Sequence, residues 1–470
     1  MTLITTIDAM QECFQSQKQA YAVNPYPSIS ERKTQLKKLK KLMIENQREI
    51  AAAMAQDFGC RNETESIMLD ILTSVGQINY TLGRLKNWMK PERRSIGMMF
   101  FPAKAEVHYQ PLGVVGVVTP WNYPVFLSMG PLIAAFAAGN RAMIKMSEFT
   151  PHTNKKIAEL LSGSFSSDEV AIVEGEVDIS VAFSKLTFDH ILFTGSGNVG
   201  KSILREAAEE LVPVTLELGG KSPCILTDNY SVKTFVKNFM LSKTLNSGQT
   251  CVAPDTLFCH RKQLDELIAA LKSSYQGYFN ESNREQDITS VINDRQWQRM
   301  KHLLSDAESK GAQVEPLSEG YNEDRRQMPT TLVLNTTDDM QISQEEIFGP
   351  LLPIVVFDKL SDVIKQVNAQ PRPLALYIFS NNIDEQRQVL YHTHSGGACV
   401  NDAAFHVGVD DLPFGGVGAS GMGSYHGEEG FKTFSHAKSV LIRGKINLTP
   451  LFGPPYGRKL HDLIIKFFMR

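Results

Sequence analysis

From about residue 114 onward, short apolar runs alternate with stretches long enough to form helices. The first such pairs are Val114–Val118 with 125–138, Ala142–Lys145 with 152–162, and Ile191–Phe193 with 198–210. Strands that alternate with helices at this spacing form βαβ units, in which neighbouring strands run parallel. The pattern restarts after Gly219-Gly220, with Pro223–Thr227 and then 231–245, and it continues to about residue 400. The sequence therefore predicts an α/β fold with two open parallel sheets, joined near residues 215–220.

The length of the chain agrees with this division. A chain of 470 residues is too long for one ordinary hydrophobic core, so two or three domains are expected. Before the alternating region, apolar positions at a helical period predict an amphipathic helix over 30–57, and a second helical stretch reaches about Trp88. The Val-rich segment 105–120 predicts two paired strands around a Gln110-Pro111 turn. The last twenty residues predict a turn followed by a short basic amphipathic helix.

Charge and cysteine usage exclude several classes of protein. The formal net charge is −3 and no long run of one sign occurs, so nothing indicates binding to nucleic acid. Residues 107–140 lack charged side chains, but four prolines interrupt them and argue against a membrane-spanning helix. No signal peptide is visible at the N-terminus. The six scattered cysteines form no CxxC pair and no metal-ligand cluster, which favours reduced thiols in the cytoplasm.

A glycine-rich turn, GSGNVG at 195–200, directly follows a predicted strand and begins a helix. Such a turn lets the backbone approach a phosphate, and the free N–H groups of the helix N-terminus favour an anion. Its spacing matches GxGxxG, but the acidic ribose contact of a dinucleotide fingerprint is not evident: Glu217 lies at about the right distance without clearly ending a second strand. A tight strand–helix turn without a ligand remains the alternative.

Three further side chains are candidates for chemistry. Cys251 follows the small polar segment NSGQT, which could expose its thiol in a cleft; the alternative is a buried small hydrophobic residue. Glu217, in the apolar strand end PVTLELGGK, suggests a carboxyl with a raised pKa and base chemistry, or else a salt bridge with Lys221. Asn122 lies between two prolines that fix its backbone, so it is either an oxyanion donor or a turn residue.

Together these segments resemble the aldehyde dehydrogenase superfamily over nearly the whole chain. The motifs occur in the family order, namely TPWNYP (119–124), KMSE (145–148), FTGS (193–196), LELGGK (216–221), GQTC (248–251), EEIFGP (345–350) and LPFGGVGASGMG (412–423). The ending SGMGSYHG resembles the class 3 and fatty or aromatic aldehyde branch. The GQTCVAPDT context and the PPYG tail are similar to bacterial coniferyl aldehyde dehydrogenases within that branch.

The resemblance implies a role for each matching residue. Cys251 matches the nucleophile, Asn122 the oxyanion amide and Glu217 the general base, with Glu346 as a rival for that last role. It also implies an NAD site, with NADP as a possible second cofactor and no metal. The matching positions are Lys145 and Glu148 for the adenosine ribose, Gly195 and Ser196 for the pyrophosphate, Glu346 and Phe348 for the nicotinamide end, and Trp121 for the cleft wall.

The resemblance further implies two Rossmann-like domains with a small β element for oligomerisation. We expect a cofactor-binding domain over 1–217, with 88–110 in the oligomerisation hairpin, and a catalytic domain over 218–410. Residues 411–470 then return to the first domain through a bridging strand and the C-terminal helix. A homodimer follows from the resemblance, and packing of that helix across the subunit contact is favoured over membrane contact.

Two residues of the KMSE motif bear on cofactor binding. Met146 stands where the family commonly has proline, which predicts a looser turn beside the adenosine site. Glu148 should repel a 2′-phosphate and favour NAD, although this branch also accepts NADP. The substrate expected is an aromatic aldehyde such as coniferaldehyde, or a medium-chain aliphatic aldehyde. Two alternative functions stay open, namely a coenzyme A-acylating dehydrogenase and a catalytically silent binding protein on the same fold.

Overall fold

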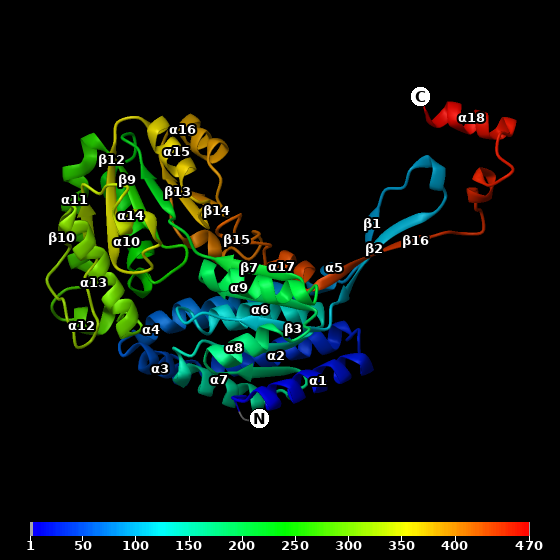
Figure 1. Ribbon diagram of the computed structural model, residues 1–470, viewed down its shortest axis with the longest axis horizontal. Coiled ribbons are helices and arrows are strands. Elements are labelled where there is room, and N and C mark those ends of the chain that lie inside the picture. The colour runs from blue at the N-terminus through cyan, green and yellow to red at the C-terminus, as the bar shows by residue number, and fades with distance from the viewer. Residues whose placement is uncertain (1–2, 470) are drawn as a thin grey trace.

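The computed structural model describes residues 3–469, and within them the strands form three sheets (Figure 1). The β3 sheet has the strand order β15-β7-β6-β3-β4-β5, in which every pairing is parallel except that of β15. Its strands are β3 (Val114–Val118), β4 (Arg141–Lys145), β5 (Val170–Val173), β6 (His190–Gly195), β7 (Val214–Leu218) and β15 (Gly421–Met422).

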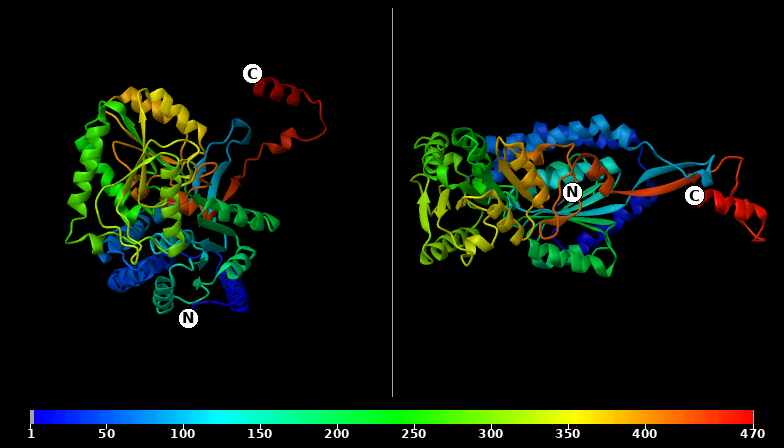
Figure 2. Two further views of the ribbon diagram at one scale, coloured as in Figure 1. Left: turned by 60° about the vertical axis from the view of Figure 1, so that its left-hand side comes forward. Right: turned by 90° about the horizontal axis from the view of Figure 1, so that it is seen from above.

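Helices cover both faces of the β3 sheet, as the view from above in Figure 2 shows. One face packs against α1 (Ile7–Val23), α8 (Val177–Ser184) and α9 (Gly197–Glu209). The other face carries a thicker layer, made of α2 (Ile29–Glu45), α3 (Gln47–Phe58), α5 (Thr73–Trp88), α6 (Phe126–Ala138), α7 (Pro151–Ser162) and α17 (Gly427–Thr433). Because both faces are covered, the strands can be continuously apolar, as Val114–Val118 is.

The β8 sheet has the order β10-β11-β12-β9-β8-β13-β14 and is parallel except for its edge strand β10. Its strands are β8 (Pro223–Leu226), β9 (Thr256–His260), β10 (Gln313–Pro316), β11 (Thr331–Leu334), β12 (Leu351–Phe357), β13 (Ala375–Phe379) and β14 (Gly397–Val400). The helices beside it are α10 (Val232–Thr244), α11 (Leu264–Tyr278), α12 (Arg284–Asp287), α13 (Asp294–Ser309), α14 (Gln341–Gln344), α15 (Leu360–Ala369) and α16 (Ile383–His392). The prediction of an α/β fold with two parallel sheets is thus confirmed.

The third sheet, called here the arm sheet, projects away from both others (Figure 1). It is antiparallel and consists of β1 (Glu92–Arg94), β2 (Lys104–Pro111) and β16 (Ser435–Ile442). Beyond it lie the 3₁₀ turn η6 (Thr449–Phe452) and the helix α18 (Lys459–Phe468), at the far end of the molecule from the β8 sheet. The predicted basic C-terminal helix is therefore present.

The predicted pairing of two strands around Gln110-Pro111 is wrong. β2 pairs with β1 and β16 in the arm sheet, whereas β3 pairs with β4 and β6 in the β3 sheet. The chain changes direction at Gly113, whose φ of +145° suits glycine and whose added Cβ would collide with the Asp189 carboxyl. Alternating Val residues indicate strands without indicating partners, and one partner of β2, the strand β16, lies more than 300 residues away in the chain.

Two smaller differences concern the N-terminal helices. The predicted helix over 30–57 is divided at Asn46, whose backbone N–H caps α2 and whose φ of −113° is not helical. The second helical stretch does end at Trp88, but it consists of α4 (Glu63–Ser66), a π-helical turn η1 (Ile67–Leu72) and α5. The remaining 3₁₀ turns are η2 (Met98–Phe100), η3 (Leu245–Gly248), η4 (Arg261–Gln263) and η5 (Phe405–Gly408). None of the helices within residues 3–469 is long and apolar enough to cross a membrane.

Candidate active site

The segment that carries Cys251 has an unusual backbone. It follows α10 and η3 and precedes β9, and Asn246, Ser247 and Gly248 adopt left-handed φ values of 50°, 52° and 74°. Left-handed conformations in residues other than glycine cost free energy and persist only where the surroundings hold them. Here Ser247 Oγ donates to the Thr289 carbonyl, and Gln249 Nε2 donates to the carbonyls of Asn246 and Ser290. Side-chain hydrogen bonds therefore hold the turn in this conformation.

The thiol of Cys251 is half-buried and lies near two carboxyl groups. Burial, followed by the charges of Glu346 and Glu217, raises its pKa to about 12, against the weaker effect of the Cys251 and Val252 N–H groups. A reactive thiol was expected to have a cation, a helix N-terminus or a base beside it. The groups found beside this thiol are the carboxyl groups of Glu346 and Glu217, which are candidate bases. The thiol is thus protonated near neutral pH, and a base must accept its proton as the sulfur attacks.

Asn122 lies in the turn after β3 and contacts the Cys251 segment directly. Its Nδ2 donates to the Gln249 carbonyl at 3.1 Å, and its own carbonyl accepts from Asn246 Nδ2 at 3.0 Å. An amide NH₂ has two protons, so one N–H of Asn122 stays available for an oxyanion. Asn122 is 2% exposed, and its Oδ1 has no hydrogen-bond partner within residues 3–469.

Glu217 is the penultimate residue of β7 and its side chain is buried. Neither carboxylate oxygen has a hydrogen-bond partner among residues 3–469, and burial raises its pKa well above the usual value for Glu. The alternative of a salt bridge with Lys221 is excluded by geometry, because Lys221 Nζ pairs with Asp255 and donates to the Ile342 and Glu345 carbonyls. Glu217 is therefore a buried carboxyl group held near the thiol.

Glu346 is the second carboxyl beside the thiol, and it is half-buried before β12. Burial raises its pKa to about 7, although a hydrogen bond from the Gly220 N–H acts in the opposite direction. A Cβ added at Gly219 would collide with the Glu346 carboxylate, so the glycine pair of LELGGK gives this side chain its space. Arg299 donates to the backbone carbonyls of Glu346 and Ile347, which fixes the segment.

The residues expected at the adenosine ribose lie together at the carboxyl end of β4. Lys145 is buried, with its pKa lowered by desolvation, and its Nζ lies 3.9 Å from the exposed carboxylate of Glu148. Met146 does not loosen the turn as expected. Its N–H donates to the Val173 carbonyl at 3.0 Å, a hydrogen bond that a proline could not form, and its carbonyl accepts from Lys145 Nζ.

The residues expected at the pyrophosphate and nicotinamide also have geometry that suits a dinucleotide. Ser196 caps α9 through Val199 N–H, and a Cβ at Gly197 would meet open space, so the first N–H groups of α9 are accessible. Trp121 and Phe348 meet edge to face with ring centroids 5.3 Å apart, and Phe348 has a φ of 52°. The orphaned Asn122 and Glu217 oxygens add polar atoms at the same place, so the residues present fit NAD(P).

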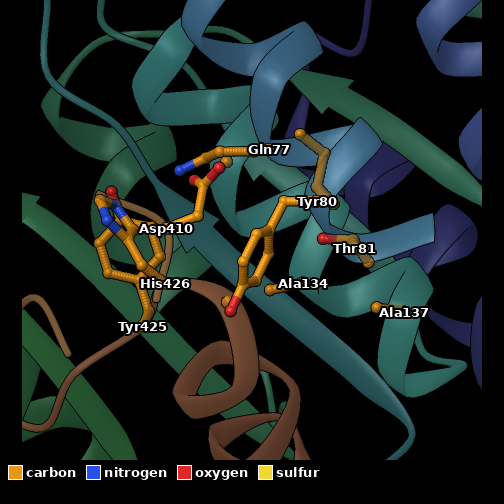
Figure 3. A pocket seen from close by; sticks show the side chains of 11 residues that line it. Gln77, Tyr80, Thr81, Ala134, Ala137, Asp410, Tyr425 and His426 are labelled. Carbon is orange, nitrogen blue, oxygen red and sulfur yellow. The ribbon is translucent and has the colours of Figure 1, made fainter. Parts of the chain in front are cut away.

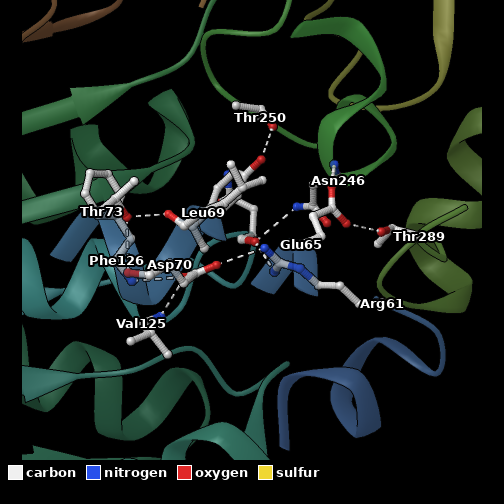
Figure 4. Close-up of polar contacts among 12 residues, drawn as sticks. Arg61, Glu65, Leu69, Asp70, Thr73, Val125, Phe126, Asn246, Thr250 and Thr289 are labelled. Carbon is white, nitrogen blue, oxygen red and sulfur yellow. Dashed lines mark hydrogen bonds and ion pairs between the residues drawn. The ribbon is translucent and has the colours of Figure 1, made fainter. Parts of the chain in front are cut away.

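Sequence reasoning missed the polar residues behind Asn122 and Cys251 (Figure 4). Arg61 and Asp70 form an ion pair of 2.9 Å whose side chains are fully buried, and Arg61 NH1 donates to the Asn122 carbonyl at 2.8 Å. Glu65 accepts from the Asn246 N–H and from the Thr289 hydroxyl. The one signal in the sequence was Asp70, a single carboxylate in the apolar run IMLDILTSV, which indicates a buried and therefore paired charge.

A small cavity lies beside the site, between α5, α6 and α17 (Figure 3). Its volume of about 10 Å³ suits one water molecule, and its lining includes His426, Tyr425 and Asp410. Both ring nitrogens of His426 lack a hydrogen-bond partner in the described part of the chain, and burial lowers the pKa of His426 to about 3. Glu217 and Cys251 contribute to the raised pKa of Tyr425, one of the residues that line this cavity.

Comparison with known proteins identifies the family to which this chain belongs. The profile of the aldehyde dehydrogenase family matches residues 5–440. The chain belongs to the aldehyde dehydrogenase family. It is 49% identical to a protein named probable coniferyl aldehyde dehydrogenase from Pseudomonas aeruginosa, over 99% of this chain and 97% of that protein.

Solved aldehyde dehydrogenases have the same fold. The substrate-bound structure of Staphylococcus aureus AldH aligns with a TM-score of 0.92 and 36% identity, covering 98% of this chain and 99% of that one. A Mycobacterium tuberculosis aldehyde dehydrogenase complexed with NAD⁺ aligns with a TM-score of 0.85 and 26% identity, covering 94% of this chain and 92% of that one. The dehydrogenase described here oxidises an aldehyde with NAD(P), and its relatives favour this function over the acyl-transferring and silent alternatives.

Proposed function

We propose that Cys251 is the nucleophile of this aldehyde dehydrogenase and that Asn122 binds the oxyanion. The observation that carries the proposal is the pair of hydrogen bonds between Asn122 and the Cys251 segment, beside two carboxyl groups. The sulfur attacks the aldehyde carbon, and the free Asn122 N–H and the Cys251 backbone N–H stabilise the oxygen of the thiohemiacetal. Loss of a hydride would convert the thiohemiacetal into a thioester on Cys251, and bound NAD(P) would supply the acceptor for that hydride.

The base that activates water against the thioester is Glu217 or Glu346, and the pKa values favour Glu346. A general base works best when its pKa lies near the operating pH, because it must be ionised and still basic. Burial raises the pKa of Glu346 to about 7, near the operating range, whereas burial raises the pKa of Glu217 with no hydrogen bond from the described residues to oppose it. The same carboxylate can accept the thiol proton in the first half-reaction, since Glu346 lies beside Cys251.

For the cofactor we propose NAD in preference to NADP. Lys145 and Glu148 would bind the adenosine ribose, Gly195, Ser196 and the α9 N-terminus the pyrophosphate, and Trp121, Glu346 and Phe348 the nicotinamide end. The exposed Glu148 carboxylate lies 3.9 Å from Lys145 Nζ, where it would repel the extra negative charge of a 2′-phosphate.

For the substrate we propose an aromatic aldehyde such as coniferaldehyde, or a medium-chain aliphatic aldehyde. Tyr123, Phe126 and Leu127 form an apolar cluster against which Leu69 and Val407 pack. The hydroxyl of Tyr123 hydrogen-bonds Thr250, the residue before Cys251, so this cluster adjoins the nucleophile. The P. aeruginosa relative is named for coniferyl aldehyde, which agrees with an aromatic substrate.

We further propose that the dehydrogenase is a cytoplasmic homodimer that assembles through its arm sheet. Residues 1–217 with the returning segment 411–470 would form the cofactor-binding unit, and residues 218–410 the catalytic unit. The arm exposes large apolar side chains, and apolar surface of this extent favours a protein contact. They are Met98 and Phe101 at the hairpin tip, Leu441 and Ile442 on β16, and Leu463, Ile465 and Phe467 on α18.

The oxidation of the aldehyde and the hydrolysis of the thioester can be tested in one experiment. NADH formation is measured with coniferaldehyde, benzaldehyde and a series of alkanals, each with NAD and with NADP. Cys251→Ala should abolish oxidation, and a near-normal rate in that variant would contradict the proposal. Glu346→Gln should give a slower burst of one NADH per site and then lose steady-state turnover, whereas the same result in Glu217→Gln alone would assign the base to Glu217.

A further inference from the structure

Two polar contacts join the N-terminal helical layer to the active site. The first runs from Asp70 in η1 through Arg61 to the carbonyl of Asn122, and the second runs from Glu65 in α4 to the backbone N–H of Asn246. Figure 4 shows the Arg61–Asp70 pair of the first contact and the Glu65–Asn246 hydrogen bond of the second. The residues concerned are up to about 180 positions apart in the chain.

Asp70 fixes the turn that contains Asn122 from its far side. Its Oδ1 accepts from the N–H groups of Val125 and Phe126, at 3.2 and 3.0 Å, which are the free donors at the start of α6. Its Oδ2 pairs with Arg61, and the fork of Arg61 reaches the Asn122 carbonyl at the same time. A planar guanidinium can bind two acceptors in fixed directions, which an ammonium group cannot do.

Glu65 holds the left-handed turn before Cys251. One carboxylate oxygen accepts from Asn246 N–H at 2.7 Å, and the other accepts from Thr289 Oγ1 at 2.8 Å. The Thr289 carbonyl in turn accepts from Ser247 Oγ, so both left-handed residues are fixed to the same neighbouring segment. Without Glu65, the strained backbone would lose the hydrogen bond that holds its first residue.

We propose that Arg61, Asp70 and Glu65 are positioning residues that keep the Asn122 amide and the Cys251 thiol in register for the oxyanion. The inference rests on the proposed roles of Asn122 and Cys251. The Arg61–Asp70 pair sets the position of the amide, and Glu65 sets the position of the thiol. All three side chains act through Asn122 or the turn before Cys251 and not on the reacting atoms themselves.

Two reactions that need no cofactor separate these effects. p-Nitrophenyl acetate acylates the thiol through a tetrahedral oxyanion, and p-nitrophenolate leaves while the thiol proton passes to a base. Iodoacetamide alkylates the same thiol as iodide leaves, and no oxyanion forms. The ratio of the acylation rate to the alkylation rate therefore reports the alignment of Asn122 with Cys251, independently of how much thiolate is present.

Arg61→Lys keeps the positive charge beside Asp70 but loses the second acceptor, and Asp70→Asn keeps the contacts to α6 but loses the charge. Both variants should lower the ratio by about 10- to 100-fold, since misplacing a catalytic group by about 1 Å can cost 100-fold. Glu65→Ala should slow both reactions, whereas Glu65→Gln retains an acceptor for Asn246 N–H and should restore both.

Arg32→Met is the matched control for lost stability. Arg32 is also fully buried, and its NH1 donates to the Ala137 and Ala138 carbonyls at the opposite end of α6. This variant should lower the melting temperature and leave the ratio unchanged. All rates are measured below the lowest melting temperature of the series.

Reference variants distinguish a failure of the proposed function from a failure of the positioning role. Acylation that survives in Cys251→Ala, or an unchanged ratio in Asn122→Ala, would contradict the proposed function. If those two variants behave as expected while Arg61→Lys and Asp70→Asn keep the wild-type ratio, the positioning role is wrong. A fall in the ratio for Arg32→Met equal to that of Arg61→Lys would likewise overturn it, because general destabilisation would then account for both.

Discussion

Replacing Glu346 by Gln should make the dehydrogenase more stable at pH 8 and have a much smaller effect on its stability at pH 5. Burial raises the pKa of Glu346 from 4.5 to about 7 in the folded chain, so the folded state binds this proton more tightly than the unfolded state does. The contribution of Glu346 to the stability of the wild type must then fall as the pH rises from 4.5 through 7. The neutral amide of Gln removes this dependence and can still accept from the Gly220 N–H.

The size of the effect follows from the difference in pKa. A rise from 4.5 to about 7 is about 2.5 units, and each unit corresponds to about 1.36 kcal/mol. The ionised carboxylate therefore costs the folded state at most about 3 kcal/mol above pH 7. Because solvent reaches part of the Glu346 side chain, a measured difference of about 2 kcal/mol would agree with the structure.

Urea unfolding of both proteins at pH 5, 6, 7 and 8 measures this difference. Glu12→Gln, at an exposed position on α1, serves as a control for the loss of a surface carboxylate. In the same buffers the steady-state rate of the wild type should rise with a midpoint near pH 7, and Glu346→Gln should lack that rise. An unfolding free energy of Glu346→Gln at pH 8 no higher than that of the wild type would refute the desolvation of this carboxyl.

Three other outcomes are expected. Glu148→Gln should raise kcat/KM for NADP relative to NAD by about tenfold, equivalent to about 1.4 kcal/mol of lost repulsion, and an unchanged preference would show that this carboxylate does not face the 2′ position. Leu69→Ser should raise KM for coniferaldehyde by about tenfold more than for acetaldehyde, because less apolar surface is buried; equal changes would place the aldehyde elsewhere. Removing residues 459–470 should shift the sedimentation coefficient toward the monomer, and an unchanged dimer would show that α18 is not needed for assembly.

Local patterns in the sequence predicted most of the α/β framework. The predicted helices over 125–138, 152–162 and 198–210 match α6, α7 and α9 to within one residue at each end. The reason is physical, because the signals are local: apolar runs form the strands, Pro151 suits the first turn of α7, and Ser196 caps α9. The family motifs in turn located Cys251, Asn122 and both carboxyl groups.

The features that sequence reasoning missed all depend on contacts between distant segments. The strand pattern of β2 does not reveal that β16 is its partner, and GCRNE gives no sign that Arg61 meets Asp70 and Asn122. The state of the Cys251 thiol was also unpredictable, since its raised pKa results from burial and from Glu346 and Glu217, which come from other parts of the chain. The pKa of a buried group therefore depends on residues that only the complete fold brings together.

The position of Glu65 and Arg61 explains why the reactive turn can be strained at all. Asn246 and Ser247 are not glycines, and each left-handed residue of this kind costs about 1–3 kcal/mol. A relaxed turn would lower that cost and would move the thiol away from Asn122. The hydrogen bonds from Asn246 N–H to Glu65 and from Asn246 Nδ2 to Asn122 stabilise the strained form, and both acceptors belong to segments packed in the N-terminal half of the chain. On the proposed mechanism, the segment from α3 to η1 contributes to the reactivity of Cys251 as well as covering the β3 sheet, because it supplies Glu65 to the turn before the thiol and Arg61 to the Asn122 carbonyl.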